Sequence, residues 1–186
     1  MDGSGSGVDL RLDVRQTPDA LLLEVEIANR RDEAIFVNAH AGNLEMDAVA
    51  PCAAYVDFLS DGSILRVNLF PPHPPEGDWI GAAVPLSRLL AAGGVYRATL
   101  RLPRPIKPWS PYDQADDAAR TEDGVVLGEA TTLEFATRWF PEAGVRWIQP
   151  GPDEETWWCT GSPTLTLRAT STLDPAIPVT GMLIAP

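Results

Sequence analysis

The residues best suited to recognition chemistry are aromatic, and they gather late in the chain. No tryptophan occurs among the first 78 residues, whereas residues 109–158 contain Trp109, Tyr112, Trp139, Phe140, Trp147, Trp157 and Trp158. Trp109 lies among prolines, and Trp157 follows the turn-forming stretch 149–153. Exposed rings beside stiff loops can stack on a sugar or anchor a partner protein. The alternative is that these rings fill the core or cover one end of it.

We predict a binding surface where two of these loops present exposed rings. The loops are residues 103–112 and 149–158, and the residues expected to contact the ligand or partner are Trp109, Tyr112, Arg146 and Trp157. Trp157 and Trp158 occupy neighbouring strand positions, so their side chains point to opposite faces. One of them is therefore expected in the core and the other at the surface.

Metal-binding patterns are poorly defined in this chain. One loop contains Asp113, Asp116, Asp117, Glu122 and Asp123, and Ca²⁺ prefers several such oxygen ligands. Their spacing lacks the regularity of a calcium loop, which favours a solvated acidic loop and leaves a bound ion as the open alternative. His40 and His73, the two histidines, have no ligand spacing with the cysteines or methionines. We predict no metal and no other cofactor.

Residues for nucleophilic catalysis are equally sparse. The stretch Cys159-Thr160-Gly161-Ser162 comes nearest to such a motif, but it lacks a Gly-x-Ser-x-Gly elbow. A strand end also supplies no helix dipole to lower the pKa of the thiol. We therefore predict no catalytic residue. The open alternative is an enzyme whose acidic residues converge from separate strands.

The charge of the chain argues against two classes of partner. The formal net charge is −12 and the pI is about 4.4, a balance that repels nucleic acid and anionic membrane surfaces. No stretch approaches the roughly 20 apolar residues that span a bilayer. Residues 1–7 are typical of a flexible Gly/Ser tail without a signal region, so we expect a cytoplasmic protein. In a reducing compartment, Cys52 and Cys159 are expected as free thiols, with a disulfide as the alternative.

Hydrophobic periodicity predicts an all-β chain. The apolar residues of 8–15 alternate with Asp and Arg, which is typical of a strand with one buried face. Similar alternation, or a short apolar run, predicts strands at residues 8–15, 21–28, 34–37, 54–59, 64–70, 95–102, 131–140, 144–148, 155–160 and 164–171. Residues 85–92 are predicted as one short helix, because an early proline and leucines on one side precede Gly93-Gly94.

The 186 residues suit one domain with a substantial core. We expect a flexible tail at residues 1–7, a single β-sandwich domain at 8–173 and an extended C-terminal tail at 174–186. About nine short antiparallel strands, one short helix and long loops are typical of a sandwich. A closed barrel is the alternative architecture.

At the level of the fold, the chain resembles the immunoglobulin and fibronectin type III group. The resemblance covers residues 8–102 and rests on the predicted hairpin of residues 21–38, its turn at Asn29 and the strand entry from Gly94 to Tyr96. It implies an immunoglobulin-like antiparallel sandwich in which Tyr96 forms a tyrosine corner and pins the preceding loop. The chain departs from true immunoglobulin domains, because Cys52, Trp79 and Cys159 do not have their Cys, Trp, Cys spacing.

These observations together favour a non-enzymatic binding or protein-interaction module. Its partner is expected to be another protein or a saccharide. A fold group of this breadth does not itself imply a function. The alternatives are a carbohydrate-binding sandwich, a proteinase inhibitor that presents a proline-stiffened loop, the enzyme described above, and a structural subunit of a larger assembly.

Overall fold

The structure is a computed structural model that describes residues 7–43, 48–49, 54–71, 84–109, 120–162 and 164–184. Its strands are β1 (Val8–Gln16), β2 (Ala20–Asn29), β3 (Ile35–His40), β4 (Gly42–Asn43), β5 (Ala48–Val49), β6 (Tyr55–Leu59), β7 (Ile64–Asn68), β8 (Leu86–Leu90), β9 (Val95–Pro103), β10 (Arg120–Pro141), β11 (Val145–Pro150), β12 (Trp157–Gly161) and β13 (Leu165–Ile184). Short 3₁₀ turns occur at Ser60–Gly62 and Glu142–Gly144. Within these ranges there is no α-helix, and hence none of the length and hydropathy needed to cross a membrane.

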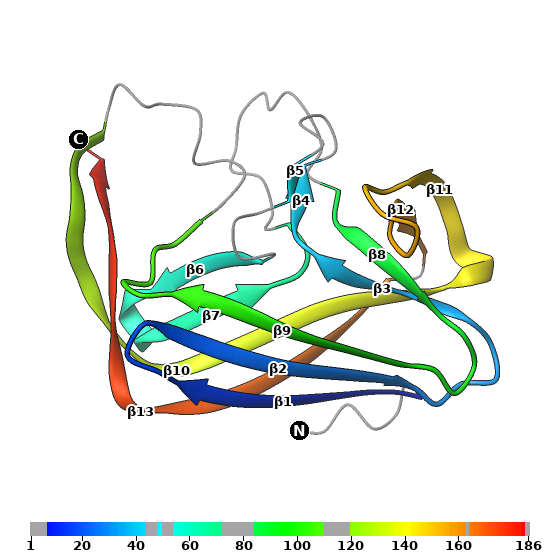
Figure 1. Cartoon of the computed structure of the whole chain (residues 1–186), viewed down its shortest axis with the longest axis horizontal. Helices are drawn as coiled ribbons and strands as arrows, with labels where there is room; N and C mark the ends of the chain where they lie inside the picture. Colours follow the sequence, from blue (N-terminus) through cyan, green and yellow to red (C-terminus); the bar gives the residue numbers. More distant parts are fainter. Residues whose placement is uncertain are drawn as a thin grey trace.

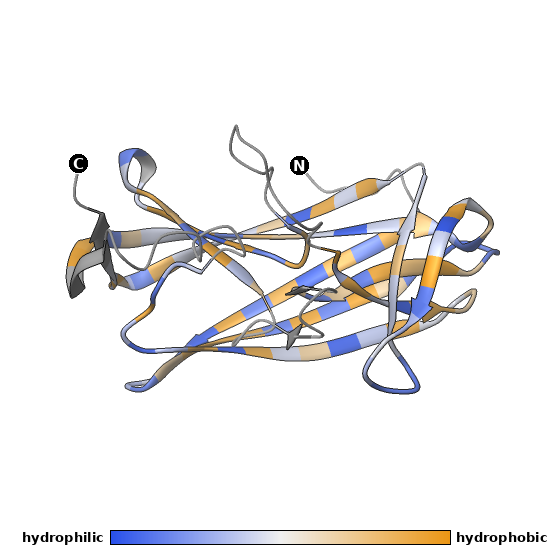
Figure 2. Ribbon diagram, turned by 90° about the horizontal axis from the view of Figure 1, so that it is seen from above, coloured by the Kyte–Doolittle hydropathy of each residue, from blue (hydrophilic) through white to orange (hydrophobic). Residues whose placement is uncertain are grey.

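The smaller sheet contains β1, β2 and β9 in the order β1-β2-β9, with both neighbouring pairs antiparallel. On β2 the side chains of Glu24 and Glu26 point outward. The alternate residues of this strand are buried, and they are Leu21, Leu23, Val25 and Ile27. Figure 2 shows this alternation of hydrophobic and hydrophilic residues along the strands. The predicted strands at residues 8–15, 21–28 and 95–102 are therefore confirmed.

The larger sheet is built around β10. β13 pairs with residues 120–139 along one edge of β10, and two other strands share the opposite edge. β7 pairs in parallel with residues 132–136, and β3 pairs antiparallel with residues 139–141. The sheet therefore forks: one branch continues from β7 to β6, and the other from β3 through β8 and β12 to β11. In Figure 1, β6 and β7 lie at the left and β3 and β8 at the right.

The predicted hairpin of residues 21–38 is wrong, although both of its strands exist. β2 has β1 and β9 on its two edges, and β3 pairs with β8 and β10 in the forked sheet. The turn after Asn29 therefore carries the chain from one sheet to the other. Residues 54–59 and 64–70, in contrast, contain the antiparallel pair β6 and β7, as predicted.

Three further predictions about the architecture are corrected. The immunoglobulin-like antiparallel sandwich is replaced by two sheets, of which the larger is forked and contains a parallel pair. The predicted helix at residues 85–92 contains strand β8, because Leu86 and Leu90 face one side of a strand that pairs with both β3 and β12. The tail expected at residues 174–186 continues β13 as far as Ile184 and pairs with the first half of β10.

The main hydrophobic core lies between the two sheets. The smaller sheet contributes Leu21, Leu23 and Ile27, and the forked sheet contributes residues that include Phe135 and Trp139. A second, smaller cluster joins three strands of the forked sheet and consists of Phe36, Phe140 and Cys159, with Val145 and Trp157 packed against it. β11 and β12 form an antiparallel hairpin. We call this second cluster the hairpin anchor, because it holds β12 of that hairpin against the body of the protein.

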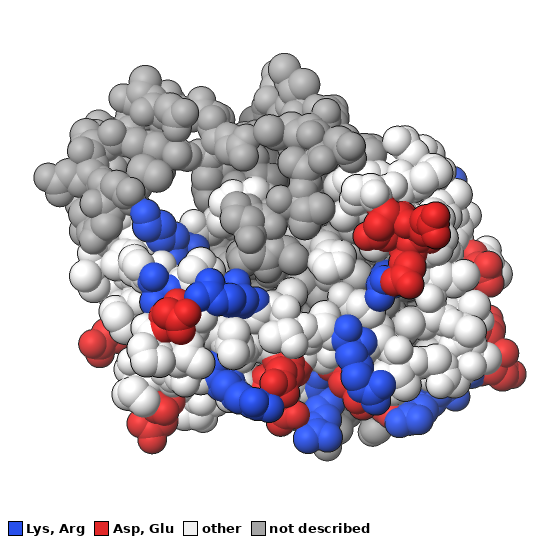
Figure 3. Space-filling model, in the orientation of Figure 1, with Lys and Arg blue, Asp and Glu red and all other residues white. Residues whose placement is uncertain are grey.

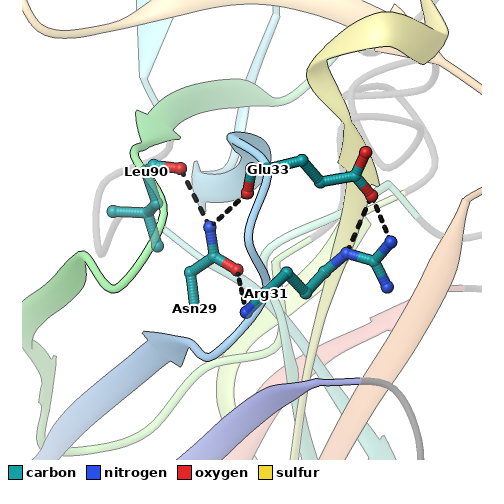
Figure 4. A network of polar contacts seen from close by, with 4 residues as sticks. All are labelled: Asn29, Arg31, Glu33 and Leu90. Carbon is teal, nitrogen blue, oxygen red and sulfur yellow. Dashed lines mark hydrogen bonds and ion pairs between the residues drawn. The ribbon is translucent and has the colours of Figure 1, made fainter.

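Asn29 stabilises the passage from β2 to β3. Its side chain is buried, its amide nitrogen donates to the carbonyl oxygens of Glu33, Leu90 and Ala91, and its amide oxygen accepts from the backbone N–H of Arg31. Figure 4 shows the bonds of Asn29 with Glu33, Leu90 and Arg31, together with the ion pair between Arg31 and Glu33. Because a buried amide without partners is costly, this network favours the chain crossing at this point.

Tyr96 forms a second link between the two sheets. Its hydroxyl, carried by β9, donates to the carbonyl oxygen of Ala39 in β3 over 3.4 Å. The predicted tyrosine corner, in which Tyr96 pins the loop before its own strand, is therefore wrong in its partner. The hydroxyl instead reaches a strand of the opposite sheet.

Candidate functional site

The four predicted contact residues lie on two different parts of the fold. Trp109 extends the β6 branch: its backbone exchanges two hydrogen bonds with Val56, of 3.0 and 2.7 Å, and its ring stacks on Tyr55 with centroids 5.5 Å apart. Trp109 is half-buried there. Tyr112 lies outside the described residues. The structure therefore places Trp109 on the β6 branch and away from the other two predicted residues.

Arg146 and Trp157 lie together on the hairpin formed by β11 and β12. Arg146 is exposed and is the extra residue of a β-bulge, since Val145 pairs with Gly161 and Trp147 pairs with the next residue, Thr160. Trp157 is half-buried and meets Phe36 edge-on, with ring centroids 6.0 Å apart. Trp158 is fully buried, which confirms that the two neighbouring tryptophans point to opposite faces.

β11 exposes two large apolar side chains that were not among the predicted contact residues. Trp147 is 39% exposed and Ile148 is 46% exposed, and the four other residues of β11 are exposed or half-buried. β11 ends the strand order of the forked sheet, so among the described residues no strand pairs with its outer edge. The sequence signal was the missing alternation: residues 145–150 place Trp and Ile next to each other instead of two apart.

A cleft opens beside residues 88–90 of β8, next to the start of β12. β12 pairs with β8 only at Leu86 and Ser87. Residues 88–90 of β8 therefore pair with β3 but not with β12. The cleft has a volume of about 410 Å³ and is bounded by residues 88–90 of β8, residues 95–97 of β9, and Glu154, Glu155 and Trp157 of the hairpin. We call this space the β8 cleft. It separates the two sheets at one edge of the molecule.

Arg88 is the central charged group of the β8 cleft. Its guanidinium forms an ion pair with Glu155, and the guanidinium carbon lies 5.6 Å from the centroid of the Tyr96 ring. Its Nε atom is buried, and within the described part of the chain it has no hydrogen-bond partner. In Figure 3, acidic side chains gather over the β11–β12 hairpin, beside a basic side chain.

Two neighbouring groups have shifted pKa values. Burial raises the pKa of Tyr96 to about 12, and the positive charge of Arg88 opposes this shift. Burial also lowers the pKa of His40, and Arg88 lowers it further, whereas Asp153 acts in the opposite direction. Both groups are therefore uncharged at neutral pH.

A second hollow, of about 380 Å³, lies on the charged outer face of the smaller sheet. Its charged side chains pair with one another: Arg97 with Glu26, and Arg11 with Asp13. Figure 3 shows the same mixture of acidic and basic side chains across the lower part of the molecule. Exposed pairs of this kind keep a sheet face soluble and contribute little energy, so this hollow is a weaker candidate than the β8 cleft.

Cys159 belongs to the hairpin anchor and is a free, buried thiol. Burial raises its pKa, although a hydrogen bond with Ser87 acts in the opposite direction. A thiol with a raised pKa is a poor nucleophile at neutral pH. Cys52 and the acidic residues Asp113, Asp116 and Asp117 lie outside the described residues, and those that are described include no group of three potential metal ligands.

The fold and these surfaces define an all-β protein of two sheets, in which the β11–β12 hairpin is exposed at the end of one branch of the forked sheet. Comparison with protein-family models, curated proteins and solved structures finds no match.

Proposed function

We propose that this chain is a non-enzymatic interaction module that binds another protein through the outer edge of β11. The observation that carries this proposal is the exposure of Trp147 and Ile148 on the last strand of a sheet branch. An exposed strand edge offers backbone donors and acceptors, and an extended segment of a partner can pair with them. Tryptophan is enriched among the few residues that carry most of the binding energy at protein interfaces.

The hairpin anchor supports this proposal, because it holds the binding strand in place before a partner arrives. Trp157 packs edge-on against Phe36, and Phe36 stacks on Phe140 with centroids 5.7 Å apart. A preorganised edge loses little conformational entropy on binding. Arg146, at the bulge of β11, adds a positive charge to a protein whose net charge is −12. Its guanidinium can pair with a single carboxylate of the partner segment.

The test compares affinity purifications from extracts of the source cell. The double variant Trp147→Ser, Ile148→Ser removes both exposed side chains. The matched control is Val126→Ser, because Val126 is 64% exposed on β10, outside the hairpin. We expect the control to recover the same partner proteins as the wild type and the double variant to lose them by about tenfold or more, the effect of removing one hot-spot residue. Binding is then measured directly with the purified partner.

Equal recovery by all three proteins would refute the β11 edge as the binding surface. A melting temperature within a few degrees of the wild type is required of each variant, so that loss of binding is separated from loss of folding. A glycan array with the same three proteins tests the saccharide alternative, since the exposed ring of Trp147 can stack on a sugar. Glycan binding that is lost with Trp147 would favour that alternative over a protein partner.

A further inference from the structure

We propose that the β8 cleft is a binding site for a small carboxylic acid with an apolar or aromatic body, and that Glu155 occupies the place of its carboxylate in the unliganded protein. This site is separate from the β11 edge. The proposal is carried by the surroundings of Arg88, the exposure of Glu155 and the apolar walls of the cleft.

Arg88 is held in position as a carboxylate receptor. Its backbone pairs with Val37 of β3, and its guanidinium lies against the ring of Tyr96. Only 29% of its side chain is exposed, and its buried Nε–H has no partner among the described residues. A guanidinium presents a planar fork of N–H donors that suits a carboxylate with two oxygens. The Nε–H is therefore a donor of that fork without an acceptor among the described residues, and because it is buried, a ligand carboxylate reaches it only when neighbouring side chains move.

Glu155 is a carboxylate that a ligand can displace. Its side chain is 72% exposed, and its ion pair with Arg88 is made by a terminal guanidinium nitrogen and not by Nε. It lies in the connection between β11 and β12, where its backbone N–H is bound by Asp153 over 2.9 Å. Exposed ion pairs contribute little to stability. Moving Glu155 into water therefore costs little, whereas a ligand carboxylate that engages Nε as well gains a second hydrogen bond.

The walls of the cleft suit an apolar ligand body. Leu89 and Val95 are among the large hydrophobic residues that the fold leaves exposed, and both line the cleft with Trp157. The volume of about 410 Å³ lies at the lower end of the range for small-molecule sites, roughly 300–1,000 Å³. A ligand with a single ring or short aliphatic chain and one carboxylate matches both the volume and the charge.

The experiment is an NMR titration of the isotopically labelled full chain with phenylacetate, and with phenylacetamide as the neutral analogue. We expect phenylacetate to produce saturable shifts of the Arg88 Nε–H and Trp157 indole resonances, and phenylacetamide to produce none. Arg88→Gln and Trp157→Phe assign these two resonances. Arg88→Gln is also expected to abolish binding. An absence of saturable shifts, or equal shifts with the amide, would overturn the proposal.

Two further variants test the role of Glu155 without disturbing Arg88. Glu155→Gln removes the competing carboxylate, and we expect phenylacetate to bind about fivefold more tightly. Glu129→Gln is the matched control: it changes the net charge equally but lies exposed on β10, outside the lining of the cleft, so it is expected to leave the affinity unchanged. Equal affinities of these two variants would refute the displacement of Glu155 by the ligand carboxylate.

The outcome is independent of the β11 edge. The variant Trp147→Ser, Ile148→Ser is expected to bind phenylacetate as the wild type does. If the wild type fails to bind phenylacetate, the carboxylate site is refuted and the proposed interaction through β11 still stands.

Discussion

The side-chain amide of Asn29 donates a hydrogen bond to the backbone carbonyl oxygen of Leu90 over 3.2 Å, and so joins the end of β2 in one sheet to the end of β8 in the other. The same amide also binds the carbonyl oxygens of Glu33 and Ala91. One buried side chain therefore serves both the turn that follows β2 and the turn that follows β8. The relative position of the two sheets at this edge depends on it.

Replacement of Asn29 is expected to destabilise the protein. Asn29→Ala leaves buried carbonyl oxygens without a donor, at a cost of about 2 kcal/mol. Asn29→Asp is expected to cost more, because it places a carboxylate against those oxygens. Chemical denaturation gives both values. The control is Thr170→Ala at an exposed position of β13, which should change the free energy of unfolding by no more than about 0.5 kcal/mol. An equally small effect of Asn29→Ala would contradict the structural role of the network.

Tyr96 is expected to make stability fall at high pH. The pKa of Tyr96 is about 12 in the folded protein and near 10 when unfolded, so the folded state retains its proton longer. Its contribution to stability is therefore present below pH 10 and is lost as the pH rises from 10 to 12. We expect the wild type to lose about 2 kcal/mol more than Tyr96→Phe over this interval. Urea denaturation at pH 9 and pH 11.5 tests this, and parallel losses in the two proteins would contradict it.

His40 is expected to make the stability of the folded protein fall at low pH. Its pKa is lowered in the folded state, first by burial and then by Arg88, so folding favours the neutral imidazole. Its contribution is present above the unfolded pKa near 6.5 and is lost as the pH falls through the lower folded pKa. NMR titration of the imidazole resonances gives the pKa directly, and His40→Gln identifies which of the two histidines is observed.

The Arg88→Gln variant extends this prediction to the β8 cleft. Removal of the positive charge is expected to raise the pKa of His40 towards its ordinary value, because one of the two causes that lower it is lost. An unchanged pKa in this variant would show that Arg88 lies too far from the imidazole to act on it.

Gly161 is expected to tolerate no larger residue while Phe140 is present. A Cβ atom at this position would lie 2.1 Å from Cδ2 of the Phe140 ring, inside the hairpin anchor. Gly161→Ala should therefore destabilise the protein by about 1–3 kcal/mol. In the double variant with Phe140→Leu, we expect the two costs to sum to more than the measured total, because the smaller side chain makes room. Strict additivity in thermal or urea denaturation would contradict the contact.

The sequence predicted individual strands well, because a period of two is a local property. Residues 8–15 alternate between apolar and charged side chains, and the structure buries Val8 and the apolar face of β2 in register with it. The failure at residues 85–92 has a local cause as well. Leu86, Leu89 and Leu90 fit the spacing of a helix, but β8 has neighbours on both edges and buries Ser87 as fully as Leu86.

The candidate site was predicted only in part. Arg146 and Trp157 do lie on one hairpin, whereas Trp109 belongs to the other branch of the sheet. Trp147 and Ile148 were missed as surface residues, since an apolar pair within a strand does not reveal that the strand ends a sheet. Arg88 had no sequence signal at all. Its neighbours are Tyr96 of β9 and Glu155 of the connection between β11 and β12.

For most strands, with residues 85–92 and 174–184 as exceptions, the amino-acid sequence by itself determined which residues are extended and which face is apolar, because the pleat repeats every two residues and burial follows it. Only the tertiary structure decided which strands are neighbours. β7 and β3 share one edge of β10, and β2 and β3 separate into different sheets at Asn29. Such pairings depend on contacts between residues far apart in the chain, which short-range periodicity does not encode. The same long-range contacts place Arg88 beside Glu155 and leave β11 at the outer edge.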